Sequence, residues 1–369
     1  MRLGIDSRMI DWSGIGRYTQ NLIVGIEEFG AEIKPILFCN RDNAHKLPGH
    51  IVSERLYINT PVLSLAAPFR LANKLNNSKI ELFHSPHYAV PFGKTSFPII
   101  VTIHDLIPLI IKQTMPNLLH RRYYYLLNSL ACHKAEKIIV PSFSTKKDVL
   151  NLFKVPETKV EVVYCVQDPI FKKISKRQLD NVKDKFAIKD GYIFALGNQK
   201  PNKGIEFLIE AYHKLVTQRS FKYKLILAGV PSKRFRRIVN LISKYGLESF
   251  VRFTGKVTDD ELVALYNGAS VFIFPSLYEG FGLPPLEAMS CEVPVIASNR
   301  SSVPEVVGDA ALLINPYDVN ELTNAITRVI EDTNLKVDLI ARGLKRTANF
   351  SLEKFTRETI AVYNRTPMA

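Results

Sequence analysis

The chain has 369 residues, of which 46% are hydrophobic and 23% are charged. This balance excludes an intrinsically disordered chain and a protein built from membrane-spanning segments. Lysine and arginine outnumber aspartate and glutamate by 49 to 35, which gives a formal net charge of +14. The excess favours anionic partners, namely nucleic acid, an acidic lipid surface or a phosphorylated ligand, although a solvated basic surface without a dedicated partner explains it too.

The length predicts two domains, each large enough to bury its own core. The four cysteines, at positions 39, 132, 165 and 291, show neither disulfide-framework nor CxxC spacing, so a reducing, cytosolic setting is expected. The N-terminal segment meets Asp6 and Arg8 too early for the apolar core of a signal peptide. The most apolar stretch, 97–111, is interrupted by His104 and Asp105 and is too short to cross a bilayer.

Short β-branched runs alternate with longer segments of helical spacing along the chain. In the first half, the expected strands are 2–5, 33–38, 80–84, 99–104 and 137–141, and the expected helices are 18–29, 68–75 and 118–132. In the second half, the expected strands are 192–196, 224–228, 251–253, 271–274, 293–297 and 311–313. The expected helices there are 204–216, 234–245, 259–269, 284–289, 319–331 and 352–363. The alternation predicts two doubly wound parallel sheets covered by helices, with a linker at Gln167–Ile174.

In open parallel sheets, ligands bind outside the carboxyl ends of the strands, so candidate sites are sought in the loops that follow strands. The first is the segment SGIGRYT, which opens a helix after the first strand. Its Gly14 and Gly16 let the backbone approach a ligand, and amides at a helix start favour an anion. The dinucleotide pattern GxGxxG is not completed, because Thr19 stands at its last position. A glycine turn needed only for packing is the alternative.

Two further motifs place histidine at strand ends in the first half. His104 and Asp105 end a buried strand, where we expect His104 to donate a hydrogen bond to a ligand and Asp105 to accept one or to orient a nucleophile. A satisfied core histidine is the alternative. His84 and His87 have the spacing of a metal pair, but Pro86 excludes helical presentation and the sequence offers no third ligand nearby. No metal site is expected, and the chain has no Asp-x-Asp pair to hold magnesium on a diphosphate.

Two loops of the second half carry charges that suit a diphosphate. The loop GNQKPNKG follows the strand 192–196, and its Lys200 and Lys203 would neutralise a diphosphate or else form a charged surface turn. The segment PSLYEGFGLPPLEAM follows the strand 271–274 and begins a helix at consecutive prolines. It places Glu279 in the loop and Glu287 inside the helix, where a carboxylate can hold a ribose diol.

This last segment resembles the Glu-x7-Glu signature of the retaining glycosyltransferases of family 4, with Glu279 and Glu287 in the acidic places. Similar blocks continue in family order along nearly the whole chain: GIGRYT, HSPHY, TIHDLIPL, VPSFSTKKD, GNQKPNKG, LILAG, VRFTGKVTDDELVALYNGA and PVIASNRSSVPEVVGDAALLINP. The resemblance implies the GT-B fold, an α/β architecture of two doubly wound Rossmann-like domains facing across a cleft. It implies an acceptor-binding domain over 1–168, a sugar-nucleotide-binding domain over 169–350, and a helix over 351–369 that returns to the first domain.

The resemblance also implies roles for the residues that match family motifs, with His104, Asp105, Glu279 and Lys203 as the catalytic candidates. Glu287 would bind the nucleotide ribose, Glu279 would lie beside the donor sugar, and Lys203 would hold the diphosphate. The other donor contacts would come from Gly14, Gly16, His104, Gly280, the amides of Phe281, Gly282 and Leu283, and, beside the base, Lys256 and Val257.

Two residues depart from the family pattern. Asn198 stands where the family often has an arginine, which leaves the diphosphate with less positive charge unless Lys200 replaces it. Glu292 stands where a small glycine is usual. The first departure concerns the candidate site itself, because Asn198 is one of the residues expected to contact the nucleotide.

The sequence therefore predicts a retaining, metal-independent hexosyltransferase with no permanently bound cofactor. Its co-substrate would be a nucleotide-diphosphate sugar, either UDP-glucose-type or GDP-mannose, and its acceptor a glycan or lipid-linked oligosaccharide in cell-surface polysaccharide synthesis. Residues 1–180 hold 24 basic against 15 acidic side chains, which suits peripheral contact with an anionic membrane from the cytoplasm. A sugar-nucleotide epimerase, a phosphorylase and a degenerate sugar-nucleotide-binding partner remain alternatives. Nucleic acid is not an expected partner, because no interleaved aromatic platform or reading helix is present in the sequence.

Overall fold

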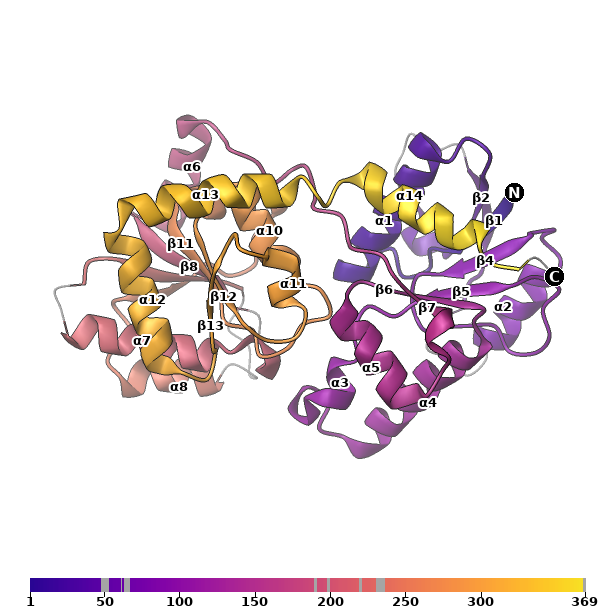
Figure 1. The fold of residues 1–369 in the computed structure, drawn as a ribbon, viewed down its shortest axis with the longest axis horizontal. Coiled ribbons are helices and arrows are strands. Elements are labelled where there is room, and N and C mark those ends of the chain that lie inside the picture. The colour runs from indigo at the N-terminus through magenta and orange to yellow at the C-terminus, as the bar shows by residue number, and fades with distance from the viewer. Residues whose placement is uncertain are drawn as a thin grey trace. The chain divides into compact units, whose positions relative to one another are not determined.

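The computed structural model describes residues 1–47, 53–60, 62, 67–188, 191–197, 200–218, 221–229 and 236–367. The chain forms two compact units (Figure 1). Unit 1 comprises Met1–Val166 together with Phe350–Ala369, and unit 2 comprises Gln167–Asn349. Each unit contains a parallel β-sheet and its own hydrophobic core.

Unit 1 is built on a seven-stranded sheet with the order β3-β2-β1-β4-β5-β6-β7, in which neighbouring strands are parallel. The strands are β1 (Arg2–Asp6), β2 (Lys34–Cys39), β3 (Glu54–Tyr57), β4 (Leu82–Ser85), β5 (Ile99–Thr102), β6 (Lys137–Val140) and β7 (Val160–Val162). The α-helices are α1 (Ser13–Phe29), α2 (Ala67–Asn76), α3 (Ile107–Ile110), α4 (Leu118–Lys134), α5 (Phe143–Phe153) and α14 (Leu352–Asn364).

Unit 2 is built on a six-stranded parallel sheet with the order β10-β9-β8-β11-β12-β13. The strands are β8 (Tyr192–Leu196), β9 (Lys224–Ala228), β10 (Val251–Phe253), β11 (Ala269–Phe274), β12 (Val295–Ser298) and β13 (Leu312–Ile314). The α-helices are α6 (Lys176–Phe186), α7 (Ile205–Gln218), α8 (Arg236–Lys244), α9 (Asp259–Asn267), α10 (Leu283–Ser290), α11 (Val303–Val307), α12 (Val319–Glu331) and α13 (Thr333–Thr347).

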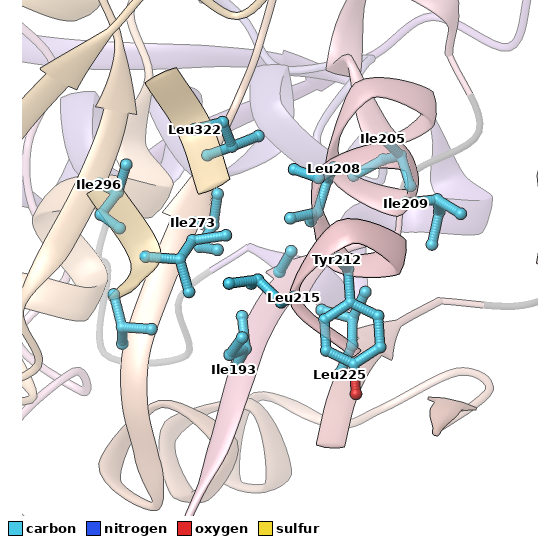
Figure 2. Close-up of a cluster of buried hydrophobic side chains, with 14 of the residues drawn as sticks. Ile193, Ile205, Leu208, Ile209, Tyr212, Leu215, Leu225, Ile273, Ile296 and Leu322 are labelled. Carbon is cyan, nitrogen blue, oxygen red and sulfur yellow. The ribbon is translucent and has the colours of Figure 1, made fainter. Parts of the chain in front are cut away.

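The core of unit 2 lies between its sheet and the helices that cover it (Figure 2). Apolar residues three or four apart place Ile205, Leu208, Tyr212 and Leu215 on one face of α7, where they pack with strand residues such as Ile193. Each such side chain stabilises the fold by about 1.5–3 kcal/mol through its burial. The strands are thereby fixed, and with them the loops that follow their carboxyl ends.

The helix α14 packs along α1, although it comes from the other end of the chain (Figure 1). The rings of Tyr18 and Phe355 meet edge to face, with their centroids 5.3 Å apart. A Cβ added at Gly25 would overlap the hydroxyl of Thr356, so glycine permits the close approach of the two helices. The last helix therefore belongs to the core of unit 1, next to the segment that follows β1.

The α/β class with two doubly wound parallel sheets is confirmed. The expected strand 99–104 is too long, because β5 ends at Thr102 and leaves His104 and Asp105 in the following loop. The expected helix 18–29 begins already at Ser13, and the helix expected over 234–245 is described only as Arg236–Lys244, because 234 and 235 lie outside the described residues. In the described ranges, no helix has both the length and the apolar character needed to cross a bilayer.

Candidate functional site

Each sheet reverses its strand order at one point, and the loops at these points carry candidate residues. In unit 1 the reversal separates β1 from β4, and in unit 2 it separates β8 from β11. Doubly wound sheets bind ligands outside the carboxyl ends of the strands at such a point. In unit 2 the loop after β8 contains Lys203 and the loop after β11 contains Glu279, so these two loops form the first candidate site.

An ion pair joins the two loops of unit 2. The Nζ of Lys203 lies 2.6 Å from Oε1 of Glu279, and the hydroxyl of Ser276 donates to the same carboxylate oxygen. The side chains of the pair are only 18% and 10% exposed. The Lys203 ammonium also lies 5.5 Å from the centre of the Phe274 ring. A cation and an anion are thus held together, with little access to solvent, at the carboxyl ends of β8 and β11.

Asn202 fixes the spacing of these loops. Its carbonyl oxygen accepts a hydrogen bond from Leu277 N at 2.6 Å, and Ser276 Oγ lies 2.9 Å from the same oxygen. Its side-chain amide donates to the carbonyl oxygen of Tyr278 at 2.9 Å. Asn202 is buried, so these bonds are made away from water, where a missing partner would be costly. The loop before Glu279 is therefore positioned by the residue that precedes Lys203.

Two glycines with positive φ angles shape the same loops. Gly204 has a φ of +66°, and a Cβ there would overlap the carbonyl oxygen of Pro275, so the loops touch backbone to backbone. Gly282 has a φ of +108° and is the N-cap of α10. Pro284 and Pro285 in the first turn of that helix lack N–H groups. The amides that the beginning of α10 can offer to an anion are therefore those of Gly282 and Leu283.

The turn that contains Gly280 and Phe281 is held by two serines that precede α11. Ser301 Oγ accepts a hydrogen bond from Glu279 N at 2.8 Å. Ser302 Oγ lies 2.7 Å from the carbonyl oxygen of Phe281 and 3.0 Å from that of Glu279, so its single proton is donated between these two acceptors. The backbone of the turn is therefore held by hydrogen bonds on both sides of Gly280.

Glu287 lies one turn into α10 and is buried. The hydroxyl of Tyr266, from α9, donates to Oε2 of Glu287 at 2.9 Å. Tyr266 is held in turn by edge-to-face contacts with the rings of Phe171, Phe194 and Phe272. The carboxylate expected to hold a ribose thus has its orientation set by a tyrosine that sequence reasoning did not single out.

Lys256 and Val257 lie in the loop after β10, where Lys256 is exposed and Val257 is half-buried. The N–H of Gly229 donates to the carbonyl oxygen of Gly255 at 3.1 Å, which holds this loop at the carboxyl end of β9. β9 neighbours β8, so Lys256 and Val257 are on the same edge of the sheet as Lys203. No described contact joins them to the ion pair.

The two departures from the family pattern are placed differently. Asn198 lies outside the described residues, and Lys200 is exposed at the start of the short helical turn Pro201–Lys203. Glu292 has a φ of +59°, a backbone conformation that favours glycine, and its carboxylate lies 3.5 Å from Lys173 Nζ. The glycine that is usual at this position is therefore explained by the backbone and not by ligand binding.

In unit 1, His104 is held by the HSPHY segment. Its Nε2 lies 2.8 Å from the carbonyl oxygen of Pro86, which can only accept, so this nitrogen carries a proton. Burial lowers the pKa of His104, although the bond to Pro86 opposes the shift. The neutral ring therefore presents Nδ1 as an acceptor, and His104 would receive a hydrogen bond from a ligand hydroxyl where donation was expected. Asp105 Oδ1 accepts a hydrogen bond at 3.0 Å from the N–H of Ile107, the first residue of α3.

A buried network connects the surroundings of His104 to the C-terminal helix. His84 Nδ1 lies 2.7 Å from the hydroxyl of Tyr363, and His84 Nε2 lies 2.8 Å from Oγ1 of Thr102. The Tyr18 hydroxyl lies 3.0 Å from the same Thr102 oxygen, and the Tyr18 ring meets the His104 ring at 4.8 Å, edge to face. Burial lowers the pKa of His84 to about 3, so the network is neutral at physiological pH. His84 is thus committed to protein partners and is not placed as a metal ligand.

The two glycines of the GIGRYT segment have different environments. Both lie in the first turn of α1. A Cβ added at Gly16 would overlap the carbonyl oxygen of Ile10, whereas none of the described heavy atoms lies within 4 Å of a Cβ added at Gly14. Gly16 is therefore needed for packing, which is the alternative interpretation of this motif, whereas the backbone of Gly14 faces open space.

An ion pair that sequence reasoning missed lies at the end of β1, in the segment that precedes these glycines. Arg8 Nε and Nη2 lie 2.8 and 2.6 Å from the two carboxylate oxygens of Asp6, and His87 Nε2 lies 3.2 Å from Asp6 Oδ2. Burial alone would raise the pKa of Asp6, but Arg8 and His87 hold it well below its usual range. The signal in the sequence is an Asp-x-Arg pair at the end of an apolar strand, where an unpaired charge would not be tolerated.

Comparisons with known proteins agree on a family. The family described as "glycosyl transferases group 1" matches residues 177–346, and the family described as "glycosyltransferase family 4" matches residues 12–169. The chain is 33% identical to O-antigen chain mannosyltransferase B of Escherichia coli, over 81% of this chain and 78% of that protein. It is 34% identical to the serotype-specific mannosyltransferase WbdA of Escherichia coli over 74% of this chain, and it spans 35% of the length of that relative. The structure of Anabaena HepE with UDP and glucose has a TM-score of 0.77 at 19% identity and covers 99% of both chains.

Proposed function

The chain belongs to the group 1 glycosyltransferases of family 4, with the GT-B fold, and from this premise we propose that it transfers mannose from GDP-mannose to a glycan acceptor. The family membership expected from the Glu-x7-Glu segment is confirmed. The observation that carries the proposal is the buried pair of Lys203 and Glu279 at the strand ends of unit 2, with Glu287 one turn into the next helix. This set provides a cation for a diphosphate and two carboxylates for sugar and ribose hydroxyls.

Each group has a distinct task in the proposed reaction. Lys203 and the amides of Gly282 and Leu283 stabilise the negative charge that grows on the diphosphate as it leaves. Glu287, oriented by Tyr266, accepts hydrogen bonds from the ribose diol. Glu279 accepts from the donor sugar and shares the Lys203 ammonium with the diphosphate. A diphosphate that binds here must therefore displace part of the Lys203–Glu279 interaction, which couples the position of Glu279 to donor binding.

The transfer is proposed to proceed with retention and without a metal ion. The bond between the anomeric carbon and the diphosphate oxygen breaks, and a bond from the acceptor hydroxyl oxygen to the same face of that carbon forms. The hydroxyl proton passes to the departing diphosphate oxygen, so no side chain has to become a covalent intermediate. The protein contributes charge stabilisation and positioning. On unit 1, His104 is proposed to accept a hydrogen bond from a sugar hydroxyl through Nδ1.

Two named relatives support mannose as the transferred sugar, since both are mannosyltransferases and one of them acts on the O-antigen chain. We therefore place GDP-mannose ahead of UDP-glucose-type donors. The test incubates the purified protein in EDTA with GDP-mannose and an α-linked mannobiose, and nuclear magnetic resonance identifies the anomer of the new linkage. The proposal requires an α-mannoside and release of GDP. Transfer from UDP-glucose alone would contradict GDP-mannose as the donor, and a β-linked product would contradict transfer with retention.

The same assay separates the other activities that the fold can host. A sugar-nucleotide epimerase would convert the donor without acceptor, and a phosphorylase would require inorganic phosphate. A degenerate binding partner would bind GDP-mannose and give no product under any of these conditions. The matched variants are Lys203→Met, which removes the proposed diphosphate contact, and Lys244→Met, which removes an exposed lysine at the end of α8.

A peripheral contact with an anionic membrane at the cytoplasmic face is proposed for helix α4. Six large apolar side chains of this helix are exposed, namely Leu118, Leu119, Tyr123, Tyr125, Leu126 and Leu130. Arg121 and Arg122 lie among them. Apolar side chains with interspersed arginine suit the boundary between headgroups and acyl chains of an anionic leaflet, where a lipid-linked acceptor would be presented.

Flotation with vesicles tests this contact. We expect binding to vesicles that contain phosphatidylglycerol, weaker binding as salt rises, and little binding to neutral phosphatidylcholine vesicles. The double variant Leu119→Ser/Leu126→Ser should lose vesicle binding and keep transfer to the soluble mannobiose. The control Val337→Ser removes an equally exposed apolar side chain from α13 of unit 2. Binding that ignores lipid charge, or that survives in the α4 variant, would remove the membrane proposal without touching the transferase proposal.

A further inference from the structure

We infer that Trp12 and Asp11 form a platform for the acceptor sugar on unit 1, an inference that rests on the proposed glycosyl transfer. Both residues lie in the loop that joins β1 to α1. β1 borders the point at which the sheet of unit 1 reverses its strand order, so this loop is at the edge where such sheets bind ligands. The corresponding loops of unit 2 carry Lys203 and Glu279, which leaves the loop of unit 1 for the second substrate.

The loop before the platform is rigid. The Asp6–Arg8 ion pair is fully enclosed, and Asn43 Nδ2 donates to the carbonyl oxygen of Arg8 at 2.9 Å. Met9 and Ile10 are buried in the body of the unit. A loop anchored by two buried apolar side chains and a buried ion pair loses little conformational entropy when a ligand binds, because its backbone is already ordered.

The side chains that follow face water. Trp12 is 41% exposed and Asp11 is exposed as well. The backbone at Trp12 is nonetheless fixed, since its N–H donates to Met9 O at 2.9 Å and its carbonyl oxygen accepts from Gly16 N at 2.5 Å. Gly14, two residues further, leaves open space beside its backbone. A large aromatic side chain thus projects from an ordered backbone without being buried by the fold.

The chemistry of the pair selects a neutral sugar. The face of an indole ring packs against the C–H groups of a pyranose, and a carboxylate accepts hydrogen bonds from its hydroxyls. The carboxylate of Asp11 repels a phosphate, and the guanidinium of Arg8 is buried in an ion pair with Asp6. The platform therefore does not suit the diphosphate end of a lipid-linked acceptor. It suits the sugar residue whose hydroxyl is glycosylated, or the residue next to it.

The chain has a single tryptophan, so its fluorescence reports on Trp12 alone. We expect α-linked mannobiose to change the emission of the wild-type protein in a saturable manner, with half-saturation at roughly 1–10 mM, as for a small sugar on an open surface. Inorganic phosphate should leave the emission unchanged. Unchanged emission with mannobiose, in a protein that transfers mannose to the same mannobiose, would overturn the platform and leave the transferase proposal intact.

Steady-state kinetics provide the second readout. Trp12→Ala should raise the KM for mannobiose about tenfold, with kcat and the KM for GDP-mannose unchanged, and Trp12→Phe should restore most of the loss because it keeps an aromatic face. Tyr57→Ala on β3 is the matched control, since Tyr57 is 41% exposed, like Trp12, and lies in the same unit. An equal rise in the control, or an unchanged KM in Trp12→Ala, would contradict the platform. If the wild-type protein transfers nothing, the proposed function itself has failed.

Discussion

The ammonium of Lys203 lies 2.6 Å from the carboxylate of Glu279, although 76 positions separate the two residues in the chain. The contact exists because β8 and β11 are neighbours in the sheet and both loops leave it at the same edge. Hydrogen bonds from Asn202 hold the two loops together, and Gly204, which has no side chain, lets their backbones approach closely. The pair is the centre of the proposed donor site, and four predictions test its surroundings and those of the candidate residues in unit 1.

Replacing Lys203 with methionine should weaken the binding of GDP about 10- to 100-fold, because one charge-assisted contact to the diphosphate is lost. Stability should fall as well, by about 1–3 kcal/mol, since the Glu279 carboxylate loses its partner in a largely buried place. Calorimetric titration below the unfolding temperature separates the two effects. Lys200→Met should weaken binding less than Lys203→Met does, and Lys244→Met should bind like the wild type; an unchanged GDP affinity in Lys203→Met would contradict the assignment.

Replacing Glu287 with glutamine should reduce the protein's discrimination between ribose and deoxyribose. The carboxylate accepts from both ribose hydroxyls in the proposed complex, whereas the amide has one acceptor oxygen, and Tyr266 already donates to this side chain. The ratio of the affinities for GDP and 2′-deoxy-GDP is therefore expected to fall about tenfold in the variant. A ratio equal to that of the wild type would show that Glu287 does not contact the ribose, whatever happens to the absolute affinity.

The glycines of α1 should separate stability from activity. Gly16→Ala should lower the free energy of unfolding by about 2–4 kcal/mol, because the new methyl group meets the backbone of Ile10. Gly14→Ala should change that free energy by no more than about 0.5 kcal/mol, since the added methyl group faces open space, and should lower kcat/KM at least about tenfold if Gly14 lies against a substrate. Full activity in Gly14→Ala would assign the whole motif to packing.

The stability of unit 1 should depend on His84 between pH 6.5 and 4.5. The pKa of His84 is about 3 in the folded protein and near 6.5 in the unfolded chain, so on acidification the unfolded state takes up a proton that the folded state does not. The stabilising contribution is complete above pH 6.5 and decreases below it, by up to about 1.4 kcal/mol per pH unit. Urea unfolding followed by Trp12 emission measures it. His84→Asn should show a shallower decrease, and parallel curves for the two proteins would contradict the prediction.

The buried strands and the charged loops at their carboxyl ends were the features best predicted from the sequence. Strands covered on both faces are continuous apolar runs, as in β8 and β11, and the charged loops that follow them stand out. The edge strands β3 and β7 were missed, because half-exposed residues such as Glu54 and Glu161 interrupt the apolar pattern. The helices α5, α6 and α13 were missed as well, since charged and polar residues make up much of each segment and interrupt its apolar spacing.

The partners of the site residues could not be predicted in the same way. Nothing in the sequence distinguishes Tyr266 from the other tyrosines of the chain, because its contact with Glu287 arises from the packing of α9 against α10. The hydrogen bonding of His104 could not be predicted for a similar reason, since the carbonyl of Pro86 comes from the loop after the neighbouring strand β4 and accepts the Nε2 proton that was expected to be donated to the ligand. The sequence does not distinguish Gly14 from Gly16, because they differ only in their surroundings: Gly16 lies against the backbone of Ile10, and Gly14 faces open space.

Calorimetric titration of the wild-type protein in EDTA with GDP, UDP and dTDP tests the central claim most directly. The claim is that unit 2 binds a nucleoside diphosphate through Lys203, the α10 amides and Glu287, without a metal ion. GDP is predicted to bind with a Kd of roughly 1–100 μM and at least about tenfold more tightly than UDP and dTDP. Binding of none of the three, or binding that appears only when a divalent metal is restored, would contradict it.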